Sequence, residues 1–338
     1  MTLFAARFLL SLTLTGVALA QTPVPVDQAA WTSDGAYLVA ARGRQLRVLD
    51  GQDGHLVKAA QVPGSEKVYI SFSPDTGREE PNWLSGMAVA GRYALTGGGD
   101  HMLHWWTVPE LEVIGEYEAS YGLTGLSLGG QGKVGGYTDS STRDLDASMM
   151  IVRLKAEGEE GSEAVTASRL PDLMQPYSSE TFGVPQVSPG GEWALGRVDE
   201  AVRLWRLSAE GVTSQELPGL TMDSLRLGGE HFYRLTQGEV EQYAYSAPTV
   251  VVRSFETTAR DAAVNEEESR LVLWTGKSIV IWSLLEVEPA ESWEQSCEGV
   301  TLCPDGGKVL LHFKDHFEAW DLQGEKKLFE IPRAKNVK

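Results

Sequence analysis

The segment 300–331 contains four short β-type runs separated by turn residues, and this pattern constrains the fold more than any other feature of the chain. The runs lie at 300–303, 309–313, 317–322 and 327–331. The clearest turn signal is Pro304-Asp305-Gly306-Gly307, and the run 309–313 is apolar almost throughout, as expected for a strand covered on both faces. Four strands in about thirty residues cannot bury their own faces, so further copies of the unit must pack against this one.

The unit recurs along the chain. The turn between its first and second strands can be aligned in seven copies, at residues 35, 91, 130, 190, 229, 267 and 306. Four of the six intervals are 38 or 39 residues long, and the other two, 56 and 60, are long enough to contain insertions. Seven four-stranded units at this period predict an all-β fold, a seven-bladed β-propeller.

A second register supports this alignment. One residue of the third strand, large in most copies, follows the turn by 14 or 15 residues in six copies and by 22 in the third copy. These residues are Leu49, Trp106, Val152, Trp205, Tyr243, Trp282 and Trp320. Their common position predicts packing between neighbouring blades, with Trp205 and Trp282 buried, and it favours a structural role for the four tryptophans over a sugar-binding platform.

The alignment also predicts the organisation of the chain. A single domain is expected over 21–333, followed by a basic tail at 334–338. Its blades are expected at 29–62, 83–117, 122–170, 184–217, 224–255, 261–292 and 297–331. The connection 63–82 is expected to be an inserted loop or hairpin, and the third copy carries an acidic excursion at 138–147.

Residues 1–20 are expected to be a signal peptide outside this domain. Arg7 supplies a thin positive region, 8–16 is largely apolar, and Ala18-Leu19-Ala20 has the small-residue pattern of a cleavage site. The apolar part is too short to span a bilayer as a helix, and a buried helix is the alternative interpretation. We therefore expect an exported protein, periplasmic or extracellular, cleaved near Ala20.

Two copies carry motifs that resemble those of WD-repeat propellers. Ser188-Pro189-Gly190-Gly191 is followed by Val202-Arg203-Leu204-Trp205, and Pro304-Asp305-Gly306-Gly307 by Trp320-Asp321. The Gly-His pair that precedes the first strand in that family is missing from every copy, and Trp-Asp occurs once. The resemblance therefore implies a divergent WD-repeat-like blade, similar also to quinoprotein or YVTN-like propellers, without the family's His-Ser/Thr-Asp-Trp hydrogen-bond set.

The chain is strongly acidic, with a formal net charge of −18. Nucleic-acid backbones and anionic membrane surfaces would be repelled by this charge, so neither is expected as a partner. A high net charge also serves solubility, and that simpler explanation remains open.

No residue pattern indicates an enzyme. The sequence has no Gly-x-Ser-x-Gly elbow, phosphate loop or dinucleotide fingerprint. His101 and His104 would point to opposite faces of a strand, and the aspartates of 138–147 lack the spacing of an EF-hand. We predict no catalytic residue, metal or cofactor.

Cys297 and Cys303 are the only cysteines. If they bracket one strand, they lie about 20 Å apart, against the ~5.5 Å that a disulfide requires. Two buried free thiols are therefore expected, and a disulfide across a turn is the alternative.

One face of the propeller is expected to bind a partner. Connections between strands 2 and 3 of a blade, and between strand 4 and the next blade, open on the same face, and the longest departures are of these two kinds. They gather around the second, third and fourth copies and bring together Trp83, Tyr137, Asp139, Asp144, Tyr177, Glu180 and Phe182. We predict a monomeric, non-catalytic scaffold that binds a basic or neutral protein or peptide. One alternative is that the long loops reflect neutral drift. The other is a propeller enzyme, or a small-ligand or calcium-binding propeller of lactonase or quinoprotein kind, with its site at the central channel.

Overall fold

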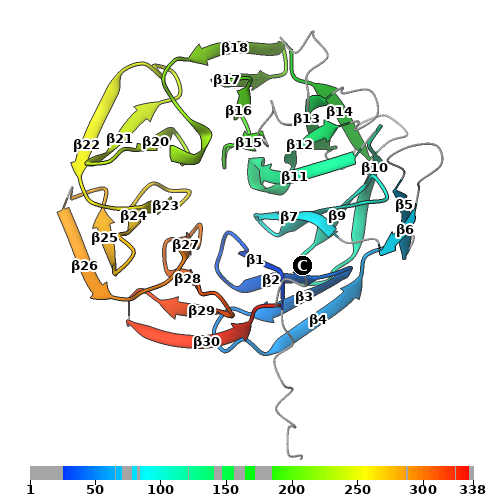
Figure 1. The fold of residues 1–338 in the computed structure, drawn as a ribbon, viewed down its shortest axis with the longest axis horizontal. Helices are drawn as coiled ribbons and strands as arrows, with labels where there is room; N and C mark the ends of the chain where they lie inside the picture. The colour runs from blue at the N-terminus through cyan, green and yellow to red at the C-terminus, as the bar shows by residue number, and fades with distance from the viewer. Residues whose placement is uncertain are drawn as a thin grey trace, which may run out of the picture.

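The computed structural model describes residues 26–64, 66–70, 78–81, 84–120, 122–140, 147–155, 164–171, 185–286, 288–323 and 325–334. These residues form seven four-stranded antiparallel sheets arranged in a ring, with a separate two-stranded sheet at the rim (Figure 1). The predicted all-β, seven-bladed propeller is therefore confirmed. In the part of the chain that the structure describes, no helix has the length and hydrophobicity that a membrane crossing requires.

Each blade is built from four strands that follow one another in the sequence. Blade 1 comprises β1 (Gln28–Trp31), β2 (Tyr37–Arg42), β3 (Gln45–Asp50) and β4 (Leu56–Gln61), and blade 2 comprises β7 (Leu84–Ala90), β8 (Tyr93–Gly98), β9 (Met102–Thr107) and β10 (Val113–Glu118). Blade 3 comprises β11 (Gly122–Gly129), β12 (Val134–Ser140), β13 (Ala147–Leu154) and β14 (Val165–Arg169). Blade 4 comprises β15 (Gln186–Val187), β16 (Trp193–Val198), β17 (Ala201–Ser208) and β18 (Gly211–Leu217).

The remaining blades are more compact. Blade 5 comprises β19 (Leu225–Leu227), β20 (His231–Leu235), β21 (Glu239–Ala244) and β22 (Val251–Glu256), and blade 6 comprises β23 (Asp261–Val264), β24 (Arg270–Trp274), β25 (Ser278–Ser283) and β26 (Glu288–Glu294). Blade 7 comprises β27 (Gly299–Leu302), β28 (Lys308–His312), β29 (His316–Asp321) and β30 (Lys326–Pro332). The connection between blades 1 and 2 contains the hairpin of β5 (Lys67–Ile70) and β6 (Arg78–Pro81), and two short 3-10 turns, η1 (Gly130–Gly132) and η2 (Met222–Ser224), complete the described elements.

The residues aligned in the third strands occupy one structural position. Each of them pairs with the second residue of its blade's second strand. The pairs are Leu49–Leu38, Trp106–Ala94, Val152–Gly135, Trp205–Ala194, Tyr243–Phe232, Trp282–Leu271 and Trp320–Val309. The seven residues also belong to seven different apolar clusters, each formed between two neighbouring blades, so their predicted role in inter-blade packing is confirmed.

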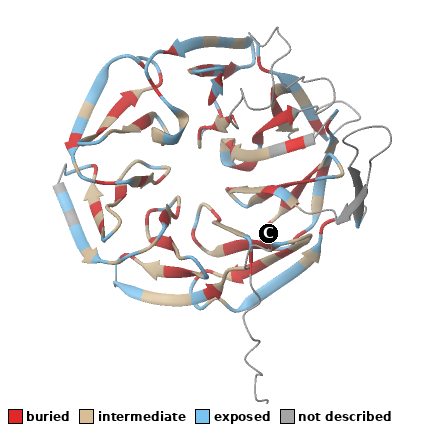
Figure 2. Ribbon diagram, in the orientation of Figure 1, coloured by how far each residue is buried: buried red, intermediate tan, exposed pale blue. Residues whose placement is uncertain are grey.

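Burial at this position varies around the ring. Trp106 and Trp205 are fully buried, whereas Trp282 is only half-buried, so the prediction that it is buried was wrong. Its indole packs edge-on against Phe255 of the outermost strand of blade 5, with ring centroids 5.4 Å apart, and this place near the rim leaves part of the ring exposed. Figure 2 shows the same trend for the whole ring, with the outermost strands mostly exposed and buried residues concentrated further in.

The ring closes without any exchange of strands. The backbone amide of Val26 donates to Pro332, and that of Ala334 donates to Val26, both at 2.9 Å, which pairs the chain before blade 1 with the end of blade 7. The Lys308 ammonium donates to the Gly35 carbonyl at 2.6 Å and links the two blades at the side of their first turns. Blade 7 and blade 1 therefore meet through non-covalent contacts alone.

In most blades the turn between the first and second strands contains a residue with a left-handed backbone. Gly35, Gly191 and Gly306 adopt it with φ of 62°, 76° and 75°, and Glu268 adopts it in blade 6 with φ of 52°. A non-glycine residue in this conformation costs about 1 kcal/mol or more. The Glu268 side chain makes hydrogen bonds that a glycine at this position could not make.

Glu268 fastens blade 6 to blade 5. One carboxylate oxygen accepts the backbone amides of Glu230 and His231 at 2.6 and 2.7 Å. The other accepts His231 Nδ1 at 2.6 Å and the Tyr233 hydroxyl at 2.9 Å. Charge-assisted hydrogen bonds of this kind are the strong ones in proteins, and together they offset the backbone strain at Glu268.

Candidate functional site

Most of the side chains expected to form the binding face lie outside the described residues. These are Trp83, Asp144, Tyr177, Glu180 and Phe182. Their role as binding residues stays a prediction.

Tyr137 and Asp139 are described, and neither side chain offers an exposed surface. Tyr137 is 0% exposed and belongs to the cluster between blades 2 and 3, and burial raises the pKa of its hydroxyl far above the ordinary value. Asp139 is only 5% exposed. The expectation that Tyr137 presents its ring to a partner is therefore wrong, because the side chain lies inside that cluster. Asp139 is buried because β12 continues to Ser140, so the first positions of the predicted excursion belong to a strand.

A cavity of about 720 Å³ lies between blades 4 and 5. Its walls come from the connection between the second and third strands of blade 4, from the connection between blades 4 and 5, and from the innermost strands of both blades. Since strands alternate in direction, these two kinds of connection open on one face of the disc. The cavity therefore lies on the face that the sequence predicted, although next to blade 5 rather than among blades 2, 3 and 4.

One wall is a two-residue turn. β16 ends at Val198 and β17 begins at Ala201, so Asp199 and Glu200 form the turn, and both side chains are exposed. Asp199 has φ of 55°, a left-handed conformation that aspartate tolerates better than most residues. The tight turn places two carboxylates at the entrance of the cavity.

The opposite wall is a short segment ordered by its own hydrogen bonds. The Ser224 amide and hydroxyl donate to the Thr221 carbonyl at 3.2 and 2.7 Å, which closes the η2 turn. Leu220 and Met222 contribute apolar surface to the cavity, and Asp223 contributes an exposed carboxylate.

Arg226 holds this segment against blades 5 and 6. Its guanidinium donates to the backbone carbonyls of Asp223, Leu225 and Ala262 at 2.9, 2.7 and 2.8 Å, and it forms an ion pair with Asp261. Asp223 and Arg226 both line the cavity, so these contacts fix that part of its wall against blade 6.

The innermost strands of the ring carry few ionisable side chains. Over the seven described strands nearest the centre, β1, β7, β11, β15, β19, β23 and β27, the ionisable side chains are Arg226 and Asp261 (Figure 1). These two are paired with each other, and the other positions are apolar residues, Gly, Ser, Thr and Gln. The described strands around the centre therefore carry one ion pair and no further ionisable side chain.

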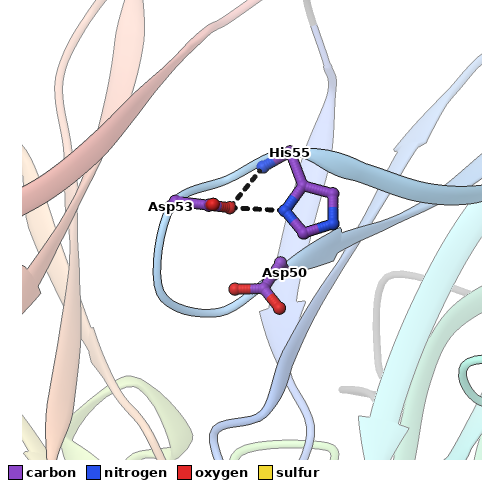
Figure 3. Close-up of side chains that lie close together, drawn as sticks. All are labelled: Asp50, Asp53 and His55. Atoms are coloured by element: carbon purple, nitrogen blue, oxygen red, sulfur yellow. Dashed lines mark hydrogen bonds and ion pairs between the residues drawn. The ribbon is translucent and has the colours of Figure 1, made fainter.

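One cluster of potential metal ligands stabilises a turn. Asp53 accepts the amide and the Nδ1 of His55 at 3.0 and 2.6 Å between β3 and β4, with Asp50 beside them (Figure 3). The hydrogen bond with Asp53 raises the pKa of His55, and both side chains are exposed. These contacts are those of a turn, on the face opposite the cavity.

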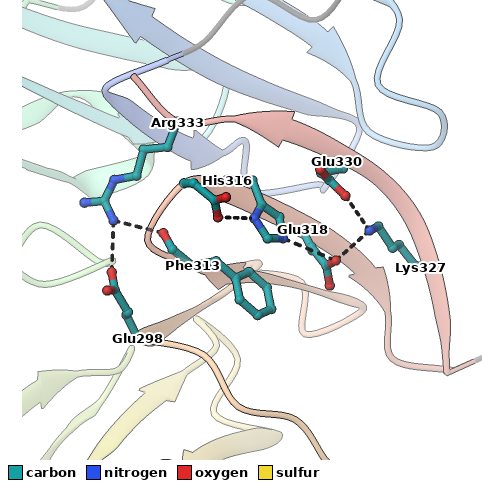
Figure 4. A network of polar contacts seen from close by, with 8 residues as sticks. Glu298, Phe313, His316, Glu318, Lys327, Glu330 and Arg333 are labelled. Carbon is teal, nitrogen blue, oxygen red and sulfur yellow. Dashed lines mark hydrogen bonds and ion pairs between the residues drawn. The ribbon is translucent and has the colours of Figure 1, made fainter. Parts of the chain in front are cut away.

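A second cluster is compensated by an internal cation. Glu318 and Glu330 lie near His316, but the Lys327 ammonium contacts both carboxylates, at 2.5 and 2.7 Å (Figure 4). Burial alone would raise the pKa of Glu318, whereas the contacts with Lys327 and Trp320 lower it. Lysine already occupies the position that an added cation would take.

Both cysteines are free thiols, as the sequence predicted. Cys303 is buried and Cys297 is half-buried, with β27 between them. Burial raises the pKa of Cys297 to about 11 and that of Cys303 still further, so neither is a nucleophile at neutral pH.

The cavity residues were not identified from the sequence. Two signals were present: the consecutive acids of the short turn at Asp199 and Glu200, and the single arginine and aspartate, Arg226 and Asp261, among otherwise uncharged innermost strands. Neither signal shows by itself that the two connections adjoin.

The fold and the cavity define a class, an all-β propeller of seven four-stranded blades with a preformed hollow on one face. No protein-family model matches the chain, and neither does any curated protein in the comparison. Solved structures do match, 1432 chains in all, and a likeness of fold does not by itself select a function. Among them is the beta-propeller domain of Cps50 (Swd1) from Myceliophteria thermophila, with a TM-score of 0.56 and 10% identity, covering 92% of this chain and 98% of that one. This likeness shows the fold alone.

Proposed function

We propose that this propeller is a non-catalytic scaffold that binds a protein or peptide partner on the face carrying the cavity. The observation that carries the proposal is the cavity itself, about 720 Å³ between blades 4 and 5. Binding sites for drug-sized ligands occupy roughly 300–1,000 Å³, so the cavity has room for several atoms of a partner's side chain or a short peptide segment.

Two further observations support binding rather than catalysis. The cavity walls are held by the Arg226 contacts and by the η2 turn, and a preformed wall lowers the entropic cost of binding. The innermost strands, where the alternative of a propeller enzyme would have its site, carry one ion pair and no other ionisable side chain.

The sequence supports three further parts of this proposal: the kind of propeller, the charge of the partner and the additional contacts. The motifs at 188–191 and 304–307 support a divergent WD-repeat-like propeller, and the net charge of −18 supports a basic or neutral partner rather than nucleic acid or a membrane surface. We take the scaffold to be monomeric, with Trp83, Asp144, Tyr177, Glu180 and Phe182 as additional contacts on the same face.

Photo-crosslinking from the two faces tests the proposal. A photoreactive amino acid at Thr221, exposed beside the cavity, should form a crosslink to a partner in an extract of the compartment where the protein resides. The same amino acid at Glu210, exposed between β17 and β18 on the opposite face, is the matched control. Crosslinks from position 210 and none from position 221 would contradict the proposed face.

Export is part of the proposal and rests on the sequence of residues 1–20, which lie outside the described residues. Expressed with its own leader, the protein should be recovered outside the cytoplasm with Gln21 as its first residue. Exported protein that retains Met1 would contradict cleavage near Ala20.

A further inference from the structure

We propose that the cavity between blades 4 and 5 is an anchor site for a single basic side chain, lysine or arginine, of an extended partner segment. This inference rests on the proposed function and names the chemistry of its binding site. It is based on the volume of the cavity, on the distribution of apolar and charged groups along its walls, and on the contacts of Arg226.

The cavity is amphipathic in the manner of a lysine or arginine side chain. Val202 and Leu220 are buried and Met222 is half-buried, and these three supply apolar wall. Asp199 and Glu200 stand exposed on the turn of blade 4. Long basic side chains bury an aliphatic stem along apolar surface and keep the cationic head among polar groups, which is the arrangement that these walls offer.

The charges favour a cation over an anion. The lining carries the carboxylates of Asp199, Glu200 and Asp223 and the guanidiniums of Arg197 and Arg226. Arg226 is paired with Asp261, a carboxylate outside the lining, and its remaining donors are directed to backbone carbonyls. Three carboxylates against two guanidiniums give the lining a formal charge of −1, and Asp261 compensates Arg226 from outside it, within a chain of net charge −18.

Arg226 therefore shapes the site and does not bind an anion. Two of its contacts reach the carbonyls of Asp223 and Leu225, at the junction of the η2 turn with β19, and the other two reach Ala262 and Asp261 of blade 6. A carboxylate or phosphate ligand would have to displace these contacts, whereas a basic side chain leaves them in place.

Methyl NMR on the full chain tests the proposal directly. The chain has seven methionines, so labelling the methionine methyls gives few signals, and a Met222→Leu variant identifies the one at the cavity. The probe is the blocked peptide Ala-Ala-Arg-Ala-Ala at low salt, with versions carrying norleucine or glutamate at the centre as controls. We expect the arginine peptide to shift the Met222 signal in a saturable manner and the glutamate peptide to leave it unchanged.

A charge-matched pair of variants separates the cavity from the general acidity of the chain. The cavity variant is Asp199→Asn, Glu200→Gln and Asp223→Asn combined, and we expect it to weaken binding of the arginine peptide at least tenfold. The control combines Glu192→Gln, Glu210→Gln and Glu230→Gln, three exposed carboxylates in turns of the opposite face, and should bind as the parent does. Equal loss in both variants would mean that only net charge matters, and would overturn the proposal.

Other outcomes of these experiments also distinguish the proposal from its alternatives. Equal binding of the norleucine peptide would show an apolar hollow without charge selection, and binding of spermidine as tight as that of the peptide would assign the cavity to free polyamines; either result overturns the basic-side-chain anchor. If crosslinking from position 221 captures a partner in the parent and in the cavity variant alike, this inference fails while the proposed function stands. If the peptide binds at Met222 but neither face yields a crosslinked partner, the cavity chemistry stands and the scaffold function fails.

Discussion

Two tryptophans at the same position of blades 2 and 4, Trp106 and Trp205, should respond differently to the same substitution. Trp106 Nε1 donates to Thr96 Oγ1 at 2.9 Å, and both residues are buried. Trp205 is equally buried, but its Nε1 has no hydrogen-bond partner among the described residues. The reason is that Gly196 stands where blade 2 has Thr96, and a Cβ there would lie 2.6 Å from the Met149 sulfur.

The magnitude follows from the unequal hydrogen bonding. Trp→Phe removes similar volume at both positions, so the packing cost largely cancels in the comparison. Trp106→Phe also removes a hydrogen bond, about 1 kcal/mol, and leaves the buried Thr96 hydroxyl unpaired, about 1–3 kcal/mol more. Trp205→Phe removes an N–H that had no partner to lose, so we expect Trp106→Phe to be more destabilising by about 2 kcal/mol.

Calorimetry of the parent and both variants is the assay, because it does not depend on tryptophan fluorescence. A difference of about 2 kcal/mol corresponds to a Tm difference of about 3 °C in a chain of this size. Adding Thr96→Val to Trp106→Phe should recover about half of the extra loss, since the unpaired hydroxyl is removed. Equal Tm values for Trp106→Phe and Trp205→Phe, or no recovery in the double variant, would refute the reasoning.

Three further predictions concern ionisable groups. Glu268→Ala removes the acceptor that holds blade 6 to blade 5 and should lower the unfolding free energy by about 3 kcal/mol in chemical denaturation, with Glu267→Ala, its exposed neighbour, as the near-neutral control. Burial raises the pKa of Glu266 in the folded protein, so its contribution to stability is complete below the pKa of the unfolded state and is lost as pH rises through the pKa of the folded state. Glu266→Gln should therefore raise Tm at pH 7 and not at pH 4. An equal gain in Tm at both pH values would contradict this. Buried Cys303 should react with a thiol reagent at pH 8 much more slowly than half-buried Cys297 until denaturant exposes both, so equally fast labelling of the two thiols in native protein would contradict the described burial.

The architecture was predictable because two separate sequence features mark the repeat in each blade. The turn between the first two strands and the packing residue of the third strand keep a nearly constant separation, and both are local sequence features with strong physical causes, a left-handed turn and a large buried side chain. Even blade 6, where Glu268 replaces glycine in the turn, kept the spacing.

The candidate site was less predictable because it depends on strand length and on contacts between blades. Asp139 was misplaced since β12 runs three residues into the predicted excursion, which turns a loop position into a buried strand position; Tyr137, one residue before the excursion, points into the cluster between blades 2 and 3. The cavity was missed since Asp199 and Asp223 belong to connections of different blades, and only the ring geometry brings them together. Arg226 and Asp261 were visible as charges, but their pairing is a property of the fold.

The closure of the ring has a consequence for how such a chain can be rearranged. Because blade 7 meets blade 1 through the pairing of Val26 with Arg333 and through side-chain contacts, no strand is shared across the seam. Circular permutation should therefore be possible at any connection between blades: joining 334 to 26 by a short flexible linker and opening the chain between β22 and β23 leaves all seven blades unbroken. The same property means that duplication or loss of one genetic repeat adds or removes one whole blade, so the number of blades can change without a half-formed sheet.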